Sequence, residues 1–355
     1  MTYHIVLNRP TDLVGLAQGA RTGENPRHSM AELAESLGAR VHDGSGLEPD
    51  ALDRIAARAT RTRPLWWAIA RRLRRDIAPG DVVFCTGEDV GIPVAALCGG
   101  RGGARVAVMM HYVDRPKGRL ALRLFRLAQR AALFTAVAHP QARFLEGFVA
   151  HHGGRARAQF VTDQTDTAFF RPGPASPDKV RPIIASVGLE QRDYATLAAA
   201  TETLDVDVKI SGFSADTKVL ARAFPATRPA NMSQRFYAWP ELLQLYRDAD
   251  IIVVSVFPSD HAAGVQALME ALACGRPVVV TATAGLEGYV NQPDAMRTVP
   301  PGDPVAMRAA ITDLLAKPDE RSRLGERAAA LARERYRLER YVEDLAAALR
   351  AIGIT

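Results

Sequence analysis

Residues 251–280 read IIVVSVFPSDHAAGVQALMEALACGRPVVV, and this stretch gives the clearest indication of the fold. Two apolar runs flank a helical stretch that Gly-Arg-Pro stops, which predicts one strand, helix and strand of a parallel sheet. Gly264 opens the helix, so the N–H groups of Gly264 and Val265 are expected to point outward and favour a phosphate. Glu270 follows six residues later, roughly 9 Å along the axis at about 1.5 Å per residue. The spacing suits a nucleotide with its diphosphate near Gly264 and its ribose near Glu270.

Glu270 itself stands in an apolar context, because Met269, Ala271 and Leu272 surround it in the sequence. Burial of an unpaired carboxylate costs several kcal/mol. A side chain kept there despite that cost is expected to contact a ligand.

Two further stretches stand in order before this segment: FVTDQTDTAFFRP at Phe160–Pro172 and SVGLEQRDYATLAAA at Ser186–Ala200. Together the three resemble the motifs of retaining glycosyltransferases with two Rossmann-like domains, the GT-B fold of glycosyltransferase group 1 or family 4. The resemblance covers about residues 160–290. It implies that Gly188 and Arg192 meet the diphosphate of a nucleotide-sugar donor, that Glu270 holds the ribose, and that the sugar is transferred with retention of its anomeric configuration.

The chain departs from the family motif at Ala262, where the family has a second Glu that recognises the donor sugar. We interpret His261 and Gln266 as replacements that hydrogen-bond the sugar hydroxyls. The alternative for His261 is that it caps the helix or contacts its own loop. Because the family carboxylate is missing, the resemblance does not identify the donor sugar.

The first half of the chain predicts a second open parallel sheet, with strands at Tyr3–Asn8, Asp81–Thr86, Arg105–Met110 and Phe134–Ala138 alternating with helices. Loops after such strands face the ligand site. They include His111, which in the family touches the donor, and the pair Glu88 and Asp89, either of which is a candidate base for the acceptor hydroxyl. The alternatives are a strand-end histidine bonded to backbone, and carboxylates that cap a helix.

The predicted fold is therefore α/β, with two Rossmann-like domains facing each other across a cleft and parallel sheets flanked by helices. The expected parts are an N-terminal acceptor domain at 1–165, a proline-rich linker at 166–182, a nucleotide-sugar domain at 183–330, and a C-terminal helix at 331–355 that crosses back to the N-terminal domain. A helix over Asp319–Ala351 is expected to break near Tyr336.

Basic residues are concentrated in the first half, where residues 1–160 hold 23 Lys and Arg against 14 Asp and Glu. The stretch Arg54–Arg75 has eight arginines and no acid, and Arg115–Arg130 has five arginines and one lysine. With Trp66 and Trp67 among the arginines, the first stretch predicts a helix that lies on an anionic membrane with its tryptophans at headgroup depth. The alternative is an arginine-covered helix whose tryptophans fill the core. No nucleic-acid recognition motif accompanies the basic residues, so we expect no nucleic-acid partner.

Three cysteines occur in or beside apolar segments, which predicts free core thiols in a reducing compartment. The N-terminus reads directly as a strand, and no uncharged apolar run approaches the roughly 20 residues of a membrane span. We therefore expect a cytoplasmic location, peripheral at the inner face of the membrane. The pairs Asp205 with Asp207 and Asp248 with Asp250 stand at the starts of strands, so we expect no metal site and no cofactor besides the nucleotide sugar.

The sequence thus predicts a metal-independent glycosyltransferase that passes a sugar from a nucleotide-diphospho-sugar to a glycan or lipid-linked acceptor. Two alternatives stay open. One is a nucleotide-sugar epimerase of the same fold, and the other is a catalytically inert module that binds a membrane or a partner.

Overall fold

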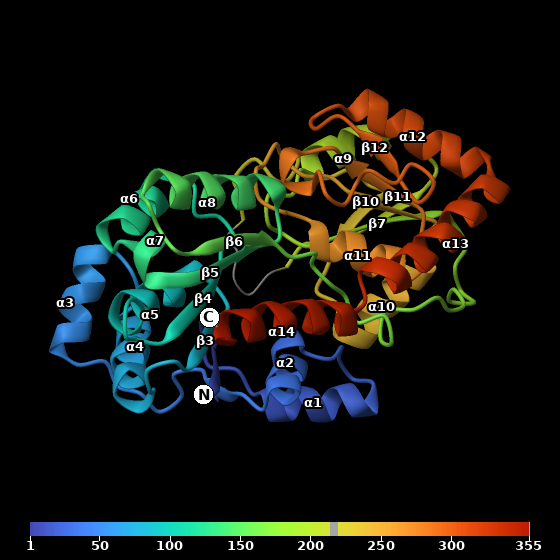
Figure 1. The fold of residues 1–355 in the computed structure, drawn as a ribbon. Helices are drawn as coiled ribbons and strands as arrows, with labels where there is room; N and C mark the ends of the chain where they lie inside the picture. The colour runs from blue at the N-terminus through green and yellow to red at the C-terminus, as the bar shows by residue number, and fades with distance from the viewer. Residues whose placement is uncertain (214–218, 355) are drawn as a thin grey trace. The chain divides into compact units, whose positions relative to one another are not determined.

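A computed structural model describes residues 1–213 and 219–354 and divides the chain into two units (Figure 1). Each unit is built on one parallel six-stranded sheet. The first unit consists of Met1–Ala17, His28–Val161 and Tyr341–Thr355, and the second consists of Gln18–Arg27 and Thr162–Arg340. The predicted α/β fold with two Rossmann-like sheets is confirmed.

The sheet of the first unit has the strand order β2-β1-β3-β4-β5-β6. Its strands are β1 (Tyr3–Val6), β2 (Arg40–His42), β3 (Val82–Cys85), β4 (Arg105–Met109), β5 (Ala131–Ala136) and β6 (Arg157–Phe160). The four predicted strands are present, with ends that differ by up to three residues. β3 is buried along its whole length, as expected for a strand of a parallel sheet that helices cover on both faces.

Helices of the first unit are α2 (Ser29–Leu37), α3 (Ala51–Thr60), α4 (Pro64–Asp76), α5 (Glu88–Cys98), α6 (Pro116–Leu124), α7 (Leu127–Arg130) and α8 (His139–His151). α4 and α5 pack side by side (Figure 1). Their apolar faces share one core with the valines of β3 and β4. Helix α1 (Leu13–Thr22) begins in the first unit and continues, from Gln18, in the second.

The sheet of the second unit has the order β12-β11-β10-β7-β8-β9. Its strands are β7 (Ile183–Val187), β8 (Asp207–Ser211), β9 (Met232–Gln234), β10 (Ile251–Val254), β11 (Val278–Thr281) and β12 (Arg297–Val299). The chain runs from β7 outward to β9, then returns to place β10 on the other side of β7. The strand order therefore reverses between β7 and β10, and the carboxyl ends of these two strands form the switch point at which such sheets bind ligands.

Helices of the second unit are α9 (Tyr194–Thr201), α10 (Trp239–Asp248), α11 (Val265–Ala273), a short 3-10 helix (Ala284–Leu286), α12 (Pro304–Ala316) and α13 (Pro318–Arg335). The predicted strand, helix and strand of residues 251–280 are β10, α11 and β11, and the two strands pair in parallel. α11 packs against α13, and every residue of α11 except Gln266 is buried. The predicted break near Tyr336 separates α13 from α14 (Leu338–Ile354).

The two units differ from the predicted domain ranges at several positions, and ion pairs accompany two of these differences. The expected linker at 166–182 lies within the second unit, where Lys179 Nζ pairs with Asp250 at 2.6 Å. Residues Gln18–Arg27 also belong to the second unit, because Arg27 Nη2 binds the carboxylates of Asp166 at 2.7 Å and Glu339 at 2.6 Å.

All three cysteines are free and buried, as the sequence predicted. Across residues 1–213 and 219–354, no helix is both long and apolar enough to cross a bilayer.

Candidate active site

Two loops meet at the switch point of the second sheet. The loop after β7 and the loop after β10 form an antiparallel bridge between Arg192 and Val256. Two backbone bonds extend this bridge, from Asp193 N to Ser255 O at 3.0 Å and from Phe257 N to Gln191 O at 2.8 Å. The two segments that the sequence singled out, around Gly188 and around Gly264, are therefore brought together.

Arg192 occupies the junction of these loops. Its Nε donates to the Val187 carbonyl at 2.8 Å, and the side chain is buried. A Cβ at Gly188 would lie 2.5 Å from Arg192 Nη2, and a Cβ at Gly264 would lie 3.0 Å from Nη1. Both glycines have positive φ, +100° and +88°, so they serve the turn and also make room for the guanidinium.

The charge of Arg192 has no carboxylate within ion-pair distance among the residues that the structure describes. A buried cation without a counter-ion is unfavourable. An anionic ligand at this position would supply the missing charge.

Helix α11 starts beside this guanidinium, with Gly264 as its N-cap residue. The Val265 N–H donates to the Ala262 carbonyl at 3.2 Å, so this predicted donor already has a partner. Leu268 N bonds Gly264 O at 3.0 Å, which leaves the N–H groups of Gln266 and Ala267 in the first turn, where helices lack internal acceptors. These groups and Arg192 form the positive end of the site.

Glu270 lies one turn further along α11 and is almost completely enclosed. The Tyr246 hydroxyl of α10 donates to Glu270 Oε2 at 2.7 Å. Burial raises the pKa of Glu270 to about 7, against the opposing effects of Tyr246, Gln266 and the charge of Arg192. The carboxyl thus has a partner inside the protein, and its predicted contact with a ribose stays a prediction.

His261 links two loops of the same site. Its Nδ1 lies 2.6 Å from Ser259 Oγ, and its Nε2 lies 3.0 Å from Glu190 Oε1. The imidazole is buried, whereas 52% of the Glu190 side chain is exposed. Sequence reasoning missed Glu190, although it stands in the quoted turn between Gly188 and Arg192. Its partner is 71 residues away, so only the fold could reveal the pair.

The candidate residues of the first unit also gather at strand ends. Glu88, at the start of α5, accepts from the backbone N–H groups of His111 at 2.9 Å and Tyr112 at 3.1 Å. His111 Nε2 donates to the Thr86 carbonyl at 3.1 Å. Desolvation and the neighbouring Glu88 raise the pKa of Asp89, although its side chain remains exposed. Glu88 therefore anchors a loop, and Asp89 is the more accessible carboxylate of the pair.

The two tryptophans of α4 lie in the core, so the prediction that they reach headgroup depth is wrong. Trp66 Nε1 donates to the Asn8 carbonyl at 2.9 Å, and Trp67 Nε1 donates to Thr62 Oγ1 at 3.0 Å. Both indoles are less than a tenth exposed. Each has found the hydrogen-bond partner that a buried indole requires.

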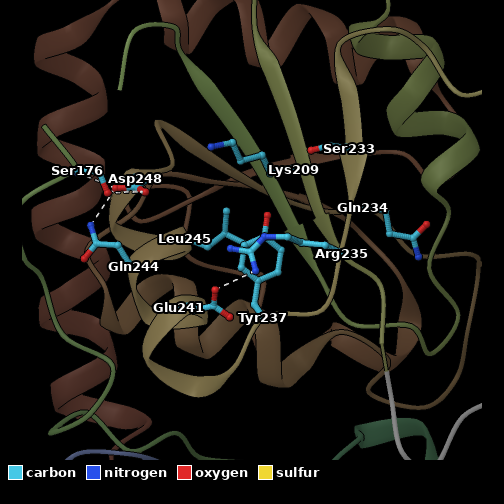
Figure 2. A pocket seen from close by; sticks show the side chains of 10 residues that line it. All are labelled: Ser176, Lys209, Ser233, Gln234, Arg235, Tyr237, Glu241, Gln244, Leu245 and Asp248. Atoms are coloured by element: carbon cyan, nitrogen blue, oxygen red, sulfur yellow. Dashed lines mark hydrogen bonds and ion pairs between the residues drawn. The ribbon is translucent and has the colours of Figure 1, made fainter. Parts of the chain in front are cut away.

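A hollow of about 490 Å³ lies beside α10 in the second unit (Figure 2). Arg235 stacks over the Tyr237 ring at 3.7 Å and pairs with Glu241 at 3.0 Å. The hollow is lined by Ser176, Lys209, Ser233, Gln234, Arg235, Tyr237, Glu241, Gln244, Leu245 and Asp248. None of these is a residue predicted to bind the donor. Arg192 and helix α11 therefore lie outside this hollow.

The family model for glycosyl transferases group 1 matches residues 192–317, from Arg192 to the start of α13. No curated protein sequence matches the chain.

Solved structures match the whole chain. Trehalose 6-phosphate synthase of Burkholderia multivorans is 13% identical with a TM-score of 0.74, and the match covers 99% of both chains. Sucrose-phosphate synthase of Thermosynechococcus elongatus is 14% identical with a TM-score of 0.71 and the same coverage. The HepE protein of Anabaena, in a complex with UDP-glucose, is 14% identical with a TM-score of 0.66, over 99% of this chain and 100% of that one. The chain therefore has the GT-B fold of these glycosyltransferases, and its residues 192–317 match the family of glycosyl transferases group 1.

Proposed function

We propose that the second unit binds a nucleotide-diphospho-sugar and that its sugar passes to a hydroxyl of an acceptor held by the first unit. One observation carries the proposal. Arg192 is a buried cation without a carboxylate partner in the described chain, and it lies at the N-terminus of α11 where the strand order reverses. A diphosphate is the anion that this combination suits best.

The proposed chemistry is electrostatic. As the bond between sugar and diphosphate breaks, negative charge grows on the leaving oxygen. Arg192 and the N–H groups of the first turn of α11 are held by the fold, so they stabilise this charge without reorganising. Such fixed positive groups stabilise the leaving diphosphate in place of a divalent cation. We therefore propose that transfer needs no metal, and that the sugar keeps its anomeric configuration.

The donor sugar is proposed to contact Glu190. This carboxylate is half exposed at the carboxyl end of β7, and His261 Nε2 holds it at 3.0 Å. The family motif places a sugar-binding Glu where this chain has Ala262. Glu190 would bring a carboxylate to the same site from the neighbouring loop, with His261 as its positioning residue.

The acceptor base is proposed to be Asp89. Glu88 uses both carboxylate oxygens on backbone N–H groups, so it is less suited to take a proton. A raised pKa brings Asp89 closer to the working pH, which strengthens a general base.

The acceptor is proposed to be lipid-linked, because α3 and α6 expose apolar residues among arginines. Leu52 and Ile55 of α3 are 68% and 65% exposed, and Leu120 and Leu124 of α6 are 64% and 66% exposed. Lys117 Nζ joins the helices by donating to the Arg61 carbonyl at 2.7 Å. The only acid within α3, Asp53, is buried against Arg71. We therefore propose that this basic and apolar face, and not the buried tryptophans, contacts an anionic membrane.

Calorimetry with UDP, GDP, dTDP and ADP, in EDTA, tests the donor site. UDP is the first choice because the similar HepE structure holds UDP-glucose. We expect selective binding of one nucleotide, weakened at least about tenfold in Arg192→Gln and unchanged in Arg333→Gln, which removes an exposed charge from α13.

Three results would redirect the proposal. If the wild type bound none of the four nucleotides, the inert module would be favoured. If the enzyme changed a nucleotide sugar without an acceptor, it would be an epimerase. If Arg192→Gln bound as well as the wild type, the diphosphate site would lie elsewhere; circular dichroism and an Arg192→Lys variant show whether a loss reflects unfolding.

A further inference from the structure

Three hollows of the first unit adjoin one another at the amino ends of β4, β5 and β6. Their volumes are about 540, 310 and 630 Å³, and all three are lined by Arg101 and Arg130. Arg105, Ala131 and Arg157 are the first residues of the three strands. The hollows therefore lie at the opposite edge of the sheet from His111, and they are separate from the proposed acceptor site.

The lining of these hollows is strongly basic. It includes seven arginines and no aspartate or glutamate: Arg74, Arg101, Arg105, Arg126, Arg130, Arg155 and Arg157. Arg105 Nη1 donates to the Gly353 carbonyl at 2.6 Å, and Arg130 donates to the Ala96 carbonyl. None of the seven forms an ion pair within residues 1–213 and 219–354. Like charges gathered in this way repel one another, and a bound polyanion would relieve that repulsion.

Arg126 lines the first hollow from an unusual backbone conformation. Arg126 has φ of 52° and ψ of 46°, the left-handed region, between α6 and α7. This conformation costs a residue with a Cβ roughly 1 to 2 kcal/mol. Glycine would adopt it without strain. The chain instead places an arginine here, and its side chain lines the first hollow.

The chemistry of the lining indicates the kind of ligand. Guanidinium groups bind phosphate oxygens in pairs of hydrogen bonds. Gly153 is exposed and Gly100 is half-buried, and neither has a side chain to keep such oxygens from the main chain. No aromatic side chain lines any of the three hollows, so the stacking that holds nucleobases is missing. We propose that these hollows form a second anion site, which binds a ligand carrying several phosphate groups.

Calorimetry with inorganic tripolyphosphate at low ionic strength tests this site in the full chain. The variant Arg101→Gln with Arg155→Gln removes two exposed charges from the hollows. The matched control, Arg323→Gln with Arg333→Gln, removes two exposed charges from α13 in the second unit. We expect the first variant to bind at least about tenfold more weakly and the control to bind within about twofold of the wild type. UDP binding should be the same in all three proteins, which separates this test from that of the donor site.

Vesicles of phosphatidylcholine and phosphatidylglycerol distinguish the source of the phosphates. If the protein binds these vesicles but not tripolyphosphate, and only the hollow variant loses that binding, the ligand is a set of lipid headgroups. If the wild type binds neither probe, or if both variants weaken binding equally, the arginines act only as general positive charge and the second site does not exist.

Discussion

At the scale of single residues, Glu270 shows how the fold sets the chemistry of a side chain. Its carboxyl is enclosed between α11 and α10, accepts a hydrogen bond from Tyr246 at 2.7 Å, and has a pKa raised to about 7 by burial. In the unfolded chain the same carboxyl has its ordinary pKa of about 4.3. Between these two values the folded protein holds a proton that the unfolded chain has released.

We predict from this difference that Glu270→Gln stabilises the protein increasingly as the pH rises. Because the folded pKa lies above the unfolded one, wild-type stability from this group is complete below about pH 4 and is lost as the pH rises through 7. Gln keeps an oxygen for Tyr246 and carries no charge. The difference in unfolding free energy between variant and wild type should grow by about 3 kcal/mol from pH 4.5 to pH 8, measured by urea unfolding. If the unfolding free energies of the two proteins changed in parallel with pH, burial would not raise the pKa of Glu270.

Glu190 leads to a second prediction. Glu190→Gln should lower kcat/KM for the true donor by about tenfold, because a carboxylate that accepts from sugar hydroxyls is replaced by a weaker acceptor. The affinity for the nucleoside diphosphate alone should not change, since that ligand has no sugar at this position. Glu202→Gln, exposed at the end of α9, is the control. Equal turnover in Glu190→Gln and the wild type would contradict a sugar contact.

At the scale of elements, the start of α11 depends on one glycine with two separate requirements. Gly264 has φ of +88°, and a Cβ there would lie 2.8 Å from Val254 Cγ1 and 3.0 Å from Arg192 Nη1. The positive φ and the contact with Val254 concern stability, whereas the contact with Arg192 concerns the position of the guanidinium that we propose binds the diphosphate.

We predict that Gly264→Ala lowers both stability and nucleotide binding, whereas a glycine variant that only strains the backbone lowers stability alone. Gly302 has φ of +71° and open space around its Cβ position. Gly302→Ala should cost about 1 to 2 kcal/mol and leave nucleotide binding intact. Gly264→Ala should cost at least as much and also weaken binding about tenfold, as thermal unfolding and calorimetry would show. Normal binding by Gly264→Ala would mean that Arg192 does not need its present position.

The elements also show what a single sequence can reveal. β10, α11 and β11 could be predicted because their apolar runs are long and glycine and proline mark their ends. β2 and β6 could not, since they are short edge strands with alternating or exposed residues. The resemblance to family motifs singled out Arg192 and the helix pattern singled out Gly264, and the roles of both in ligand binding stay predictions. The bond of Glu190 to His261 and that of Tyr246 to Glu270 could not be predicted, because each joins segments that only the tertiary fold brings together.

At the scale of the whole molecule, the excess of basic residues belongs to the first unit, and we predict that it binds anionic vesicles through α3 and α6. Leu120→Ser with Leu124→Ser removes exposed apolar contacts without changing charge, so binding should fall about tenfold or more in flotation assays. Val305→Ser, 77% exposed on α12 in the second unit, is the control. If the double variant floated with the vesicles as well as the wild type, α3 and α6 would not form the membrane-binding surface.

The tail of the chain has a consequence for synthesis on the ribosome. Tyr341–Thr355 belongs to the first unit, where Leu345 and Leu349 are buried and Arg350 binds the Ser36 carbonyl at 3.0 Å. This segment emerges only after the entire second unit has been translated, roughly ten seconds or more after Val161 at cellular elongation rates. The half that is made first is therefore finished last. During that interval its uncovered apolar surface is exposed to chaperones, and a ribosome that stalls within the second unit would release a first unit that lacks its final helix.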